Sequence, residues 1–388
     1  MYFDRLGLRS DPIQVEALRM CLTRSVSVLT GGPGTGKTTI IRALVEAASS
    51  KVIVRLCAPT GRAARRLAES SGAAAATIHR LLGARGHGQF EYGPDNPLDC
   101  GLLIVDESSM LDARLLQRLL AALPERAGVV FVGDADQLPS VGLGACLRDL
   151  IAGAVPTARL ARVYRQDEGS GIAHGAQHLL VGQVPDFGNG LWYVGEDDPE
   201  RAAGKLVDLA ARADAVQVLS PMRKGPLGVT RLNQLLREQL NPPPSGRTSN
   251  EIGGFRAGDR VVQTTNDYDL GVMNGEIGRV LTVNPTERIP QVRFEDRDVD
   301  YDALQVSGLE FAFAITIHKA QGAQYPCVLM PLSTQHYVML TRPLIYTGLT
   351  RAERDAVFVG QEKALRLALH RVNDGERRTR LKNLLARS

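Results

Sequence analysis

Residues 31–38 read GGPGTGKT, after the apolar run VSVLT (26–30) and before the helix-forming run TIIRALVEAA (39–48). Glycines let backbone N–H groups turn inward around phosphate oxygens, and the N-terminus of the following helix points at the same negative charge. The spacing GxxxxGK[ST] puts Lys37 on the β- and γ-phosphates and the Thr38 hydroxyl on Mg²⁺. The stretch therefore predicts a strand, a phosphate-binding loop and a helix that together handle a nucleoside triphosphate.

Short apolar runs, separated by helical or loop sequence, occur in two groups along the chain. The first group covers 26–30, 52–57, 102–105 and 129–132. The second group covers 216–220, 311–317, 327–332 and 356–360. Such runs are typical of parallel sheets in α/β domains. We therefore expect two α/β lobes, a first at 1–165 and a second at 166–254 and 307–388.

Two stretches interrupt this pattern and are interpreted as insertions. Residues 255–306 contain short alternating runs with an Asn-Gly pair at 274–275, which favours antiparallel strands, and we expect a small β-barrel there. Residues 83–98, GARGHGQFEYGPDNPL, lie inside the first lobe. They fit either a protruding β-hairpin or a plain surface loop.

Composition excludes several classes of protein. With 388 residues, 44% hydrophobic and 23% charged, the chain resembles ordinary soluble globular proteins and is long enough for two or three domains. It has no apolar run long enough to span a bilayer, and its charged N-terminus does not resemble a secretory signal, so we expect a cytoplasmic protein without a membrane partner. Its five cysteines form no CxxC pair and are expected to be reduced. The net charge of +4 permits a polyanionic partner.

An acidic pair follows one of the buried runs. LLIVDESSM at 102–110 is four apolar residues ending in Asp106 and Glu107. The carboxyl edge of an open parallel sheet is where ligands bind. Asp106 is therefore expected to hold Mg²⁺, and Glu107 to polarise the attacking water as general base.

Three further residues are candidates for stabilising charge on the γ-phosphate. Gln137 lies in FVGDADQLPSVGLG at 131–144, after another apolar run, and is expected to contact that phosphate and report whether it is present, although a helix-capping loop around Asp134 and Asp136 also fits this stretch. Arg165 in VYRQ follows the last elements of the first lobe, and Arg351 in YTGLTRAERD is expected to open a helix in the second lobe. An arginine delivered by a part that can move stabilises the transition state, although either arginine also fits a structural ion pair.

Taken in order, these motifs resemble those of a superfamily 1 helicase, and most closely its RecD-like branch, which moves 5′ to 3′ (1B). The glycine-rich loop matches motif I. The remaining matches are APTGRAARRL (58–67, Ia), VDESSM (105–110, II), GDADQLPSVG (133–142, III), VYRQ (163–166, IV), TIHKAQG (316–322, V) and GLTRA (348–352, VI). They stay in register over nearly the whole chain.

The resemblance implies two RecA-like lobes with Mg²⁺-ATP in the cleft and single-stranded DNA across both. It implies a monomeric motor that translocates 5′ to 3′ and opens single-strand/duplex junctions. It also implies that 83–98 is a duplex-splitting pin, called subdomain 1B, and that 255–306 is an SH3-like barrel, called subdomain 2B. Work in DNA repair or recombination, with other repair proteins as partners, is expected from the branch.

The motif positions assign roles residue by residue. The expected catalytic residues are Lys37, Glu107, Gln137, Arg165 and Arg351, and the expected Mg²⁺ ligands are Thr38 and Asp106. The expected nucleotide contacts are Gln14, which resembles an adenine-reading glutamine, together with Gly32, Gly34, Thr35, Gly36, Lys37, Thr38, Thr39 and Gln324. The expected DNA contacts are Pro59, Thr60, Arg62, His79, Thr316 and His318, where the two histidines also fit purely structural roles.

One position departs from the family pattern. After motif V the family usually carries a glutamate on the nucleotide sugar, where this chain has Gln324, which hydrogen-bonds without charge assistance. Three other functions stay open. An RNA helicase uses nearly the same motifs, a regulatory ATPase uses the same loop without translocating, and a nucleic-acid clamp needs no hydrolysis. Intact Lys37, Thr38, Asp106 and Glu107 argue against the clamp.

Overall fold

The structure is a computed structural model, and it describes residues 11–85, 89–162, 170–243, 254–267, 269–284, 286, 289–295, 297–372 and 380–385. The chain divides into two compact units. The first comprises residues 1–168 and 374–388, and the second comprises residues 169–373. None of the described helices is both long and apolar enough to cross a bilayer.

The first unit is built on a six-stranded parallel sheet with the order β3-β2-β4-β5-β1-β6. Its strands are β1 (Val26–Gly31), β2 (Val54–Ala58), β3 (Ala75–Thr77), β4 (Leu102–Val105), β5 (Gly128–Gly133) and β6 (Thr157–Leu160). The four strands expected from the apolar runs are confirmed, whereas β3 and β6 at the two edges were not predicted. Its helices are α2 (Pro12–Thr23), α3 (Lys37–Ala48), α4 (Gly61–Ser71), α5 (Ile78–Leu81), η1 (Ser108–Met110), α6 (Ala113–Ala121), α7 (Cys146–Ala152) and α14 (Leu381–Leu385).

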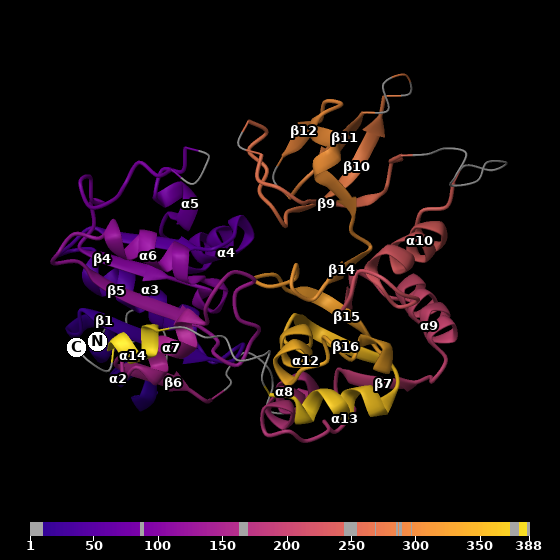
Figure 1. The fold of residues 1–388 in the computed structure, drawn as a ribbon, viewed down its shortest axis with the longest axis horizontal. Coiled ribbons are helices and arrows are strands. Elements are labelled where there is room, and N and C mark those ends of the chain that lie inside the picture. Colours follow the sequence, from indigo (N-terminus) through magenta and orange to yellow (C-terminus); the bar gives the residue numbers. More distant parts are fainter. Residues whose placement is uncertain are drawn as a thin grey trace. The chain divides into compact units, whose positions relative to one another are not determined.

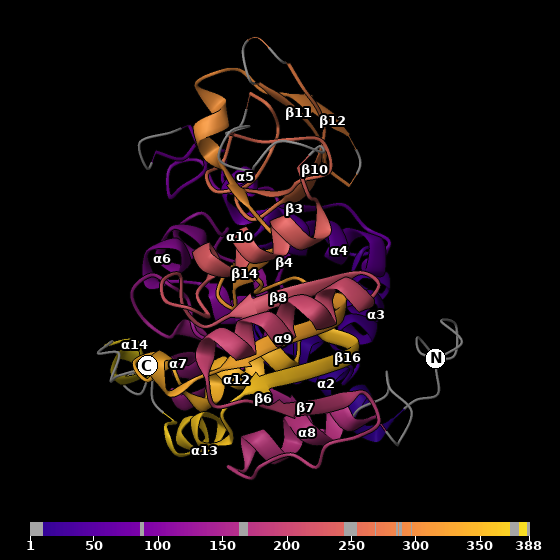
Figure 2. The ribbon, with the colours of Figure 1, turned by 90° about the vertical axis from the view of Figure 1, so that its right-hand side faces the viewer.

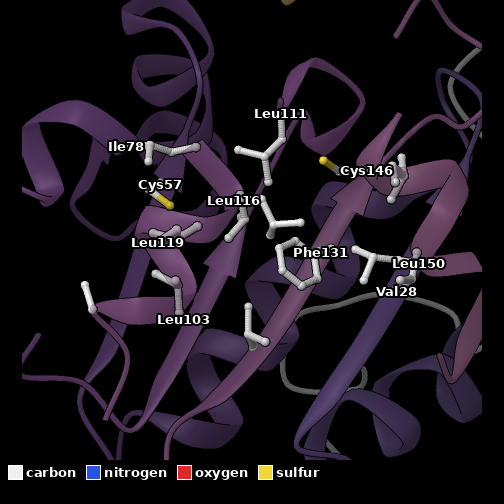
Figure 3. Close-up of a cluster of buried hydrophobic side chains, with 14 of the residues drawn as sticks. Val28, Cys57, Ile78, Leu103, Leu111, Leu116, Leu119, Phe131, Cys146 and Leu150 are labelled. Atoms are coloured by element: carbon white, nitrogen blue, oxygen red, sulfur yellow. The ribbon is translucent and has the colours of Figure 1, made fainter. Parts of the chain in front are cut away.

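Helices cover both faces of this sheet because alternate strand residues point to opposite sides. On one face, Phe131 and Leu103 pack with residues of α6 and α7 such as Leu116 and Leu150 (Figure 3). On the other face, neighbouring strand residues pack against α2, α3 and α4. This two-sided burial explains the continuous apolar runs of the sequence.

One expectation for the first unit stays a prediction, and another needs correction. The described part of 83–98 contains isolated antiparallel bridges at Ala84–Phe90 and Gly93–Asn96, and 86–88 lie outside the description, so a hairpin or a surface loop there stays a prediction. The chain's C-terminal helix α14 was expected in the second lobe, but it packs on α7 of the first unit. Its Leu381 and Leu385 are partly buried against the core on that side.

The second unit has a five-stranded parallel sheet with the order β14-β8-β15-β16-β7. The strands are β7 (Leu191–Gly195), β8 (Val216–Ser220), β14 (Ala314–Thr316), β15 (Tyr325–Leu332) and β16 (Ala352–Gly360). The helices α9 (Pro199–Arg212) and α10 (Val229–Leu240) cover one face, as Figure 2 shows. The opposite side carries α8 (Gly171–Leu180), α12 (Arg342–Leu349) and α13 (Glu362–His370) (Figure 1), and η3 (Thr334–His336) packs against α13. The sequence predicted this sheet except for its edge strand β7.

A five-stranded antiparallel sheet, β12-β11-β10-β9-β13, is inserted between α10 and β14. Its elements are β9 (Arg260–Gln263), β10 (Ile277–Val283), β11 (Pro290–Arg293), β12 (Asp298–Asp300), η2 (Gln305–Gly308) and β13 (Leu309–Phe311). Antiparallel strands were predicted here, but the sheet extends beyond residue 306 to include β13. Closure into a barrel stays a prediction, because the strand pairings among the described residues leave β12 and β13 as the two edges of an open sheet.

Candidate functional site

The glycine-rich loop joins β1 to α3 and has the backbone geometry of an anion cradle. Gly34 and Gly36 adopt φ of 73° and 87°, in the left-handed region that favours glycine. A Cβ on Gly31 would lie 2.6 Å from a backbone oxygen of β6, so a larger residue does not fit there. Lys37 Nζ donates to the carbonyls of Gly31 (2.6 Å) and Gly32 (2.8 Å), which holds its charge against the loop. The loop therefore fits a polyphosphate.

The remaining expected nucleotide contacts of the first unit surround this loop. Thr35 is buried and its Oγ1 donates to the Gly32 carbonyl at 2.8 Å, so it braces the loop from within. Thr38 is exposed in the first turn of α3, with Thr39 half-buried beside it. Gln14 is buried on α2, a helix that packs against α3. Contact of these side chains with a nucleotide stays a prediction.

The acidic pair lies where the sequence placed it, at the carboxyl end of β4. Burial raises the pKa of Asp106, and the neighbouring charge of Glu107 raises it further, while the cations Lys37 and Arg66 act in the opposite direction. Asp106 therefore lies within electrostatic reach of the loop lysine. Glu107 has φ 50° and ψ 38°, a conformation that strains a residue other than glycine and that is often found at functional sites.

Gln137 is on the loop that follows β5, the neighbour of both β4 and β1. It is 4% exposed, and its Nε2 donates to Asp134 Oδ2 at 3.0 Å, whereas no partner within the described residues reaches its Oε1. A buried amide oxygen without a partner is costly and suggests a ligand. The amide N–H of Ala135 donates to Thr30 Oγ1 at 3.3 Å, which ties this loop to the last residues of β1.

Magnesium fits this arrangement. Mg²⁺ is normally held by one or two carboxylates together with substrate phosphates and water, so Asp106 and Thr38 beside a phosphate cradle form a sufficient protein contribution. A fuller cage is not required, and the described residues contain no cluster of three or more His, Cys, Asp or Glu that would form one.

The expected DNA contacts of the first unit also follow the carboxyl ends of its strands. Pro59 and Thr60 come directly after β2, and Thr60 Oγ1 caps α4 by accepting from the amide of Ala63 at 3.2 Å. Arg62 lies half-buried in the first turn of that helix. His79 on α5 has its ring centroid 6.1 Å from that of Phe90. Burial lowers the pKa of His79, so it is neutral near pH 7.

In the second unit, the residues expected to contact DNA or the nucleotide lie in two places. Thr316 ends β14, and its Oγ1 accepts from the amide of Lys319 at 3.2 Å, with His318 between them. Gln324 and Arg351 directly precede β15 and β16, whose first residues are paired, so the structure brings these two together. Whether Thr316 and His318 contact DNA is untested.

Arg351 is not where the sequence analysis expected it. We predicted that it opens a helix, but α12 ends at Leu349 and Arg351 lies just before β16. It is 3% exposed, and its guanidinium donates to the carbonyls of Thr347 (3.2 Å) and Ala323 (3.1 Å). Helix N-capping and periodicity do not predict such burial. The other expected arginine, Arg165 in motif IV at 163–166, lies outside the described residues.

Two arginines near the site were missed by the sequence analysis. The positive charge of Arg66 on α4 lowers the pKa of Asp106. Arg66 is one of several arginines in GRAARRL, and periodicity alone does not distinguish it from the others. Arg148 on α7 donates to two carbonyls of the Gln137 loop. Its spacing from Gln137 matches no motif, so only the folded structure reveals it.

Family models match most of the chain. An AAA domain model matches residues 9–191, and the model described as the ATP-dependent RecD-like DNA helicase SH3 domain matches residues 232–294. A UvrD-like helicase C-terminal domain model matches residues 311–359. The order of these matches follows the two units and the antiparallel insertion.

Similar curated proteins decide the family. The RecBCD enzyme subunit RecD of Mycobacterium tuberculosis is 32% identical over 413 residues, covering 92% of this chain and 70% of that protein. The chain belongs to the RecD-like family of superfamily 1 helicases. The ATP-dependent RecD2 DNA helicase of Deinococcus radiodurans is 41% identical over 387 residues, covering 98% of this chain. The RecD-like chain spans only 53% of the length of that relative.

Solved structures support the fold of this RecD-like chain. A structure described as DNA unwinding at forked duplex DNA by two coordinating Pif1 helicases has a TM-score of 0.58 at 19% identity, covering 90% of this chain and 92% of that one. Bacteroides Pif1 bound to single-stranded DNA has a TM-score of 0.54 at 20% identity, with the same coverage. At this identity the likeness concerns the fold alone.

Proposed function

We propose that this RecD-like chain is an ATP-dependent DNA helicase that translocates 5′ to 3′ on single-stranded DNA and unwinds duplex. One observation carries the proposal beyond family membership. A single edge of the six-stranded sheet gathers the lysine of the phosphate loop, the half-buried carboxylate of Asp106, and the buried Gln137, whose Oε1 has no partner among the described residues. Together these groups fit Mg²⁺ and a triphosphate.

The proposed binding roles follow from the geometry of the first unit. The N–H groups of the loop and the N-terminus of α3 hold the phosphates. Lys37 exchanges its two carbonyl partners for phosphate oxygens, and Asp106 with Thr38 holds Mg²⁺. Gln14 contacts the base, while Gln324 contributes a neutral hydrogen bond to the sugar. When bound, Mg²⁺-ATP supplies the free energy of phosphoanhydride hydrolysis.

The proposed chemical roles belong to three side chains. Glu107 accepts a proton from the attacking water at its carboxylate, and its strained backbone fixes the direction of that carboxylate. Gln137 Oε1 orients the same water, which satisfies its missing hydrogen bond. Arg351 supplies positive charge from the second unit, and leaving its carbonyl partners for the nucleotide links hydrolysis to a change of state in that unit.

The proposed DNA contacts accept any sequence. A motor must bind every base, so contacts are expected to the backbone and to base faces rather than to base edges. Pro59, Thr60 and His79 follow the carboxyl ends of strands in the first unit, and Thr316 with His318 does so in the second. Junctions of single-stranded and duplex DNA are the proposed substrate, and we place the activity in the cytoplasm. Repair or recombination partners are proposed from the relatives alone.

Hydrolysis measured with matched DNA and RNA oligonucleotides tests the proposal. We expect DNA to stimulate ATP turnover strongly and RNA of the same sequence to stimulate it weakly, with Glu107→Gln abolishing turnover while ATP still binds. Equal stimulation by RNA would favour an RNA helicase instead. Turnover that ignores both nucleic acids would favour a regulatory ATPase.

A further inference from the structure

The loop that carries Gln137 is held from α7 by one arginine. Arg148 Nε donates to the Ala135 carbonyl at 2.8 Å, and its Nη2 donates to the Gln137 carbonyl at 3.0 Å. The two acceptors flank Asp136, so one planar guanidinium grips the loop on both sides of its turn. A lysine has a single ammonium and cannot reproduce a fork with this fixed geometry.

Other hydrogen bonds also hold this loop. Asp134 accepts from the amide of Asp136 at 3.0 Å and from Gln137 Nε2, and these two bonds lie within the loop. Thr30 anchors the loop only at Ala135. Arg148 adds to these a hydrogen bond from outside the loop to the backbone carbonyl of Gln137 itself.

The helix that carries Arg148 is a firm base. Cys146, Leu147 and Leu150 of α7 are buried in the sheet core, as Figure 3 shows for two of them. The terminal helix α14 also packs on α7, and Leu385 comes within 2.7 Å of the position that a Cβ on Gly153, just after α7, would occupy. Because the core holds this helix in place, the Arg148 guanidinium can hold the loop in a fixed position.

We infer that Arg148 is a positioning residue for Gln137: it sets the distance of the glutamine side chain from the γ-phosphate without touching the nucleotide. The inference rests on the proposed ATP hydrolysis. It predicts that loss of Arg148 slows the chemical step and leaves ATP affinity unchanged, because the phosphate loop itself does not depend on this contact. Misplacement of a catalytic group by about 1 Å costs up to about 100-fold in rate.

A double-mutant cycle on the full chain tests this. Single-turnover hydrolysis, ATP binding and thermal unfolding are measured for Arg148→Ala, Arg148→Lys, Gln137→Ala and the double variant Arg148→Ala/Gln137→Ala. Arg55→Met is the control, because Arg55 Nε also donates to a backbone carbonyl of the first unit, that of Asp99, at 3.2 Å. We expect Arg148→Ala to slow hydrolysis about 10- to 100-fold with ATP affinity within about twofold. Arg148→Lys is expected to lose nearly as much, and Arg55→Met nothing.

The decisive result is the double variant. If Arg148 acts through Gln137, the double variant is no slower than Gln137→Ala alone, and added ethylguanidinium partly restores Arg148→Ala but not the double variant. Losses that multiply, or a wild-type rate in both Arg148 variants, overturn the inference. If Arg148→Ala does not fold, Arg148→Lys with Gln137→Ala completes the same cycle. A wild-type chain that does not hydrolyse ATP refutes the proposed function, whereas multiplying losses in a wild-type chain that does hydrolyse ATP refute only the role of Arg148, so the two failures are distinguishable.

Discussion

Replacement of Asp259 by asparagine removes one charge from a buried network that joins the antiparallel sheet to α10. Asp259 is fully buried and accepts from Arg237 Nε (2.9 Å), Arg237 Nη2 (2.8 Å), Asn241 Nδ2 (2.8 Å) and the amide of Arg256 (2.9 Å). Arg237 is itself 8% exposed and stacks 4.3 Å from the ring centroid of Phe311. Both members of the ion pair are therefore shielded from water.

The size of the effect follows from this geometry. An asparagine of the same shape offers one acceptor oxygen where the carboxylate offered two, and its amide points donors at groups that are also donors. It also leaves the Arg237 guanidinium buried without a counter-charge. Breaking one side of a buried ion pair costs about 3–5 kcal/mol, so we expect Asp259→Asn to lower the free energy of unfolding of the second unit by about that much.

Urea unfolding followed by tryptophan fluorescence measures this change, because the only tryptophan of the chain, Trp192, lies on β7 of the same unit. The midpoint should fall with little change in the slope against urea. The matched control is Asp298→Asn in the same antiparallel sheet, where the Arg293–Asp298 pair is exposed and its loss should leave the midpoint unchanged. Equal midpoints for Asp259→Asn and wild type would refute the reasoning.

Three other changes give independent tests. Gly36→Ala forces a left-handed φ of 87° on alanine, which costs roughly 1–2 kcal/mol; binding of a fluorescent ATP analogue should weaken by about 5- to 30-fold, and unchanged affinity would contradict the cradle. Glu310→Gln removes the negative charge that pairs with Arg223 (2.5 Å) and Lys319 (2.9 Å). If Arg223 and Lys319 contact DNA phosphates, this change should tighten binding to single-stranded DNA and steepen the dependence of log affinity on log salt by about 0.7 for each phosphate gained. Unchanged affinity and slope would show that these two cations do not contact the DNA backbone. His336 is buried, and burial lowers its pKa from 6.5 to about 4. The unfolded chain therefore binds the extra proton between these values, and stability present above pH 6.5 should be lost as the pH falls toward 4. His336→Leu should flatten that pH dependence of the unfolding midpoint, and an unchanged slope would argue against a neutral buried imidazole.

The central strands were predictable because each is buried on both faces. Continuous runs such as those of β1, β4 and β5 need apolar side chains on both sides, and this leaves a clear sequence signal. The edge strand β3 consists of Ala75, Ala76 and Thr77, which have no such signal, and its pairing depends on the neighbouring β2. Side-chain alternation likewise indicated the antiparallel sheet but not its last strand β13.

The site was predictable wherever a local motif specifies it. The phosphate loop and the acidic pair are each defined by neighbours in sequence, so Lys37 and Asp106 were placed correctly at the sheet edge. The state of Arg351 was not predictable, since its guanidinium is held by the carbonyl of Ala323, distant in sequence. Arg148 was missed for the same reason, because its role depends on where the folded loop presents two carbonyls. Side-chain to backbone contacts between separate segments have no spacing rule.

The most direct test of the account is unwinding of duplexes that carry either a 5′ or a 3′ single-stranded tail, measured together with DNA-stimulated ATP hydrolysis for wild type and Lys37→Ala. The account predicts that wild type opens only the 5′-tailed duplex and that Lys37→Ala neither hydrolyses ATP nor unwinds. Unwinding from the 3′ tail would contradict the proposed direction. ATP hydrolysis indifferent to DNA, with neither duplex opened, would contradict the helicase itself.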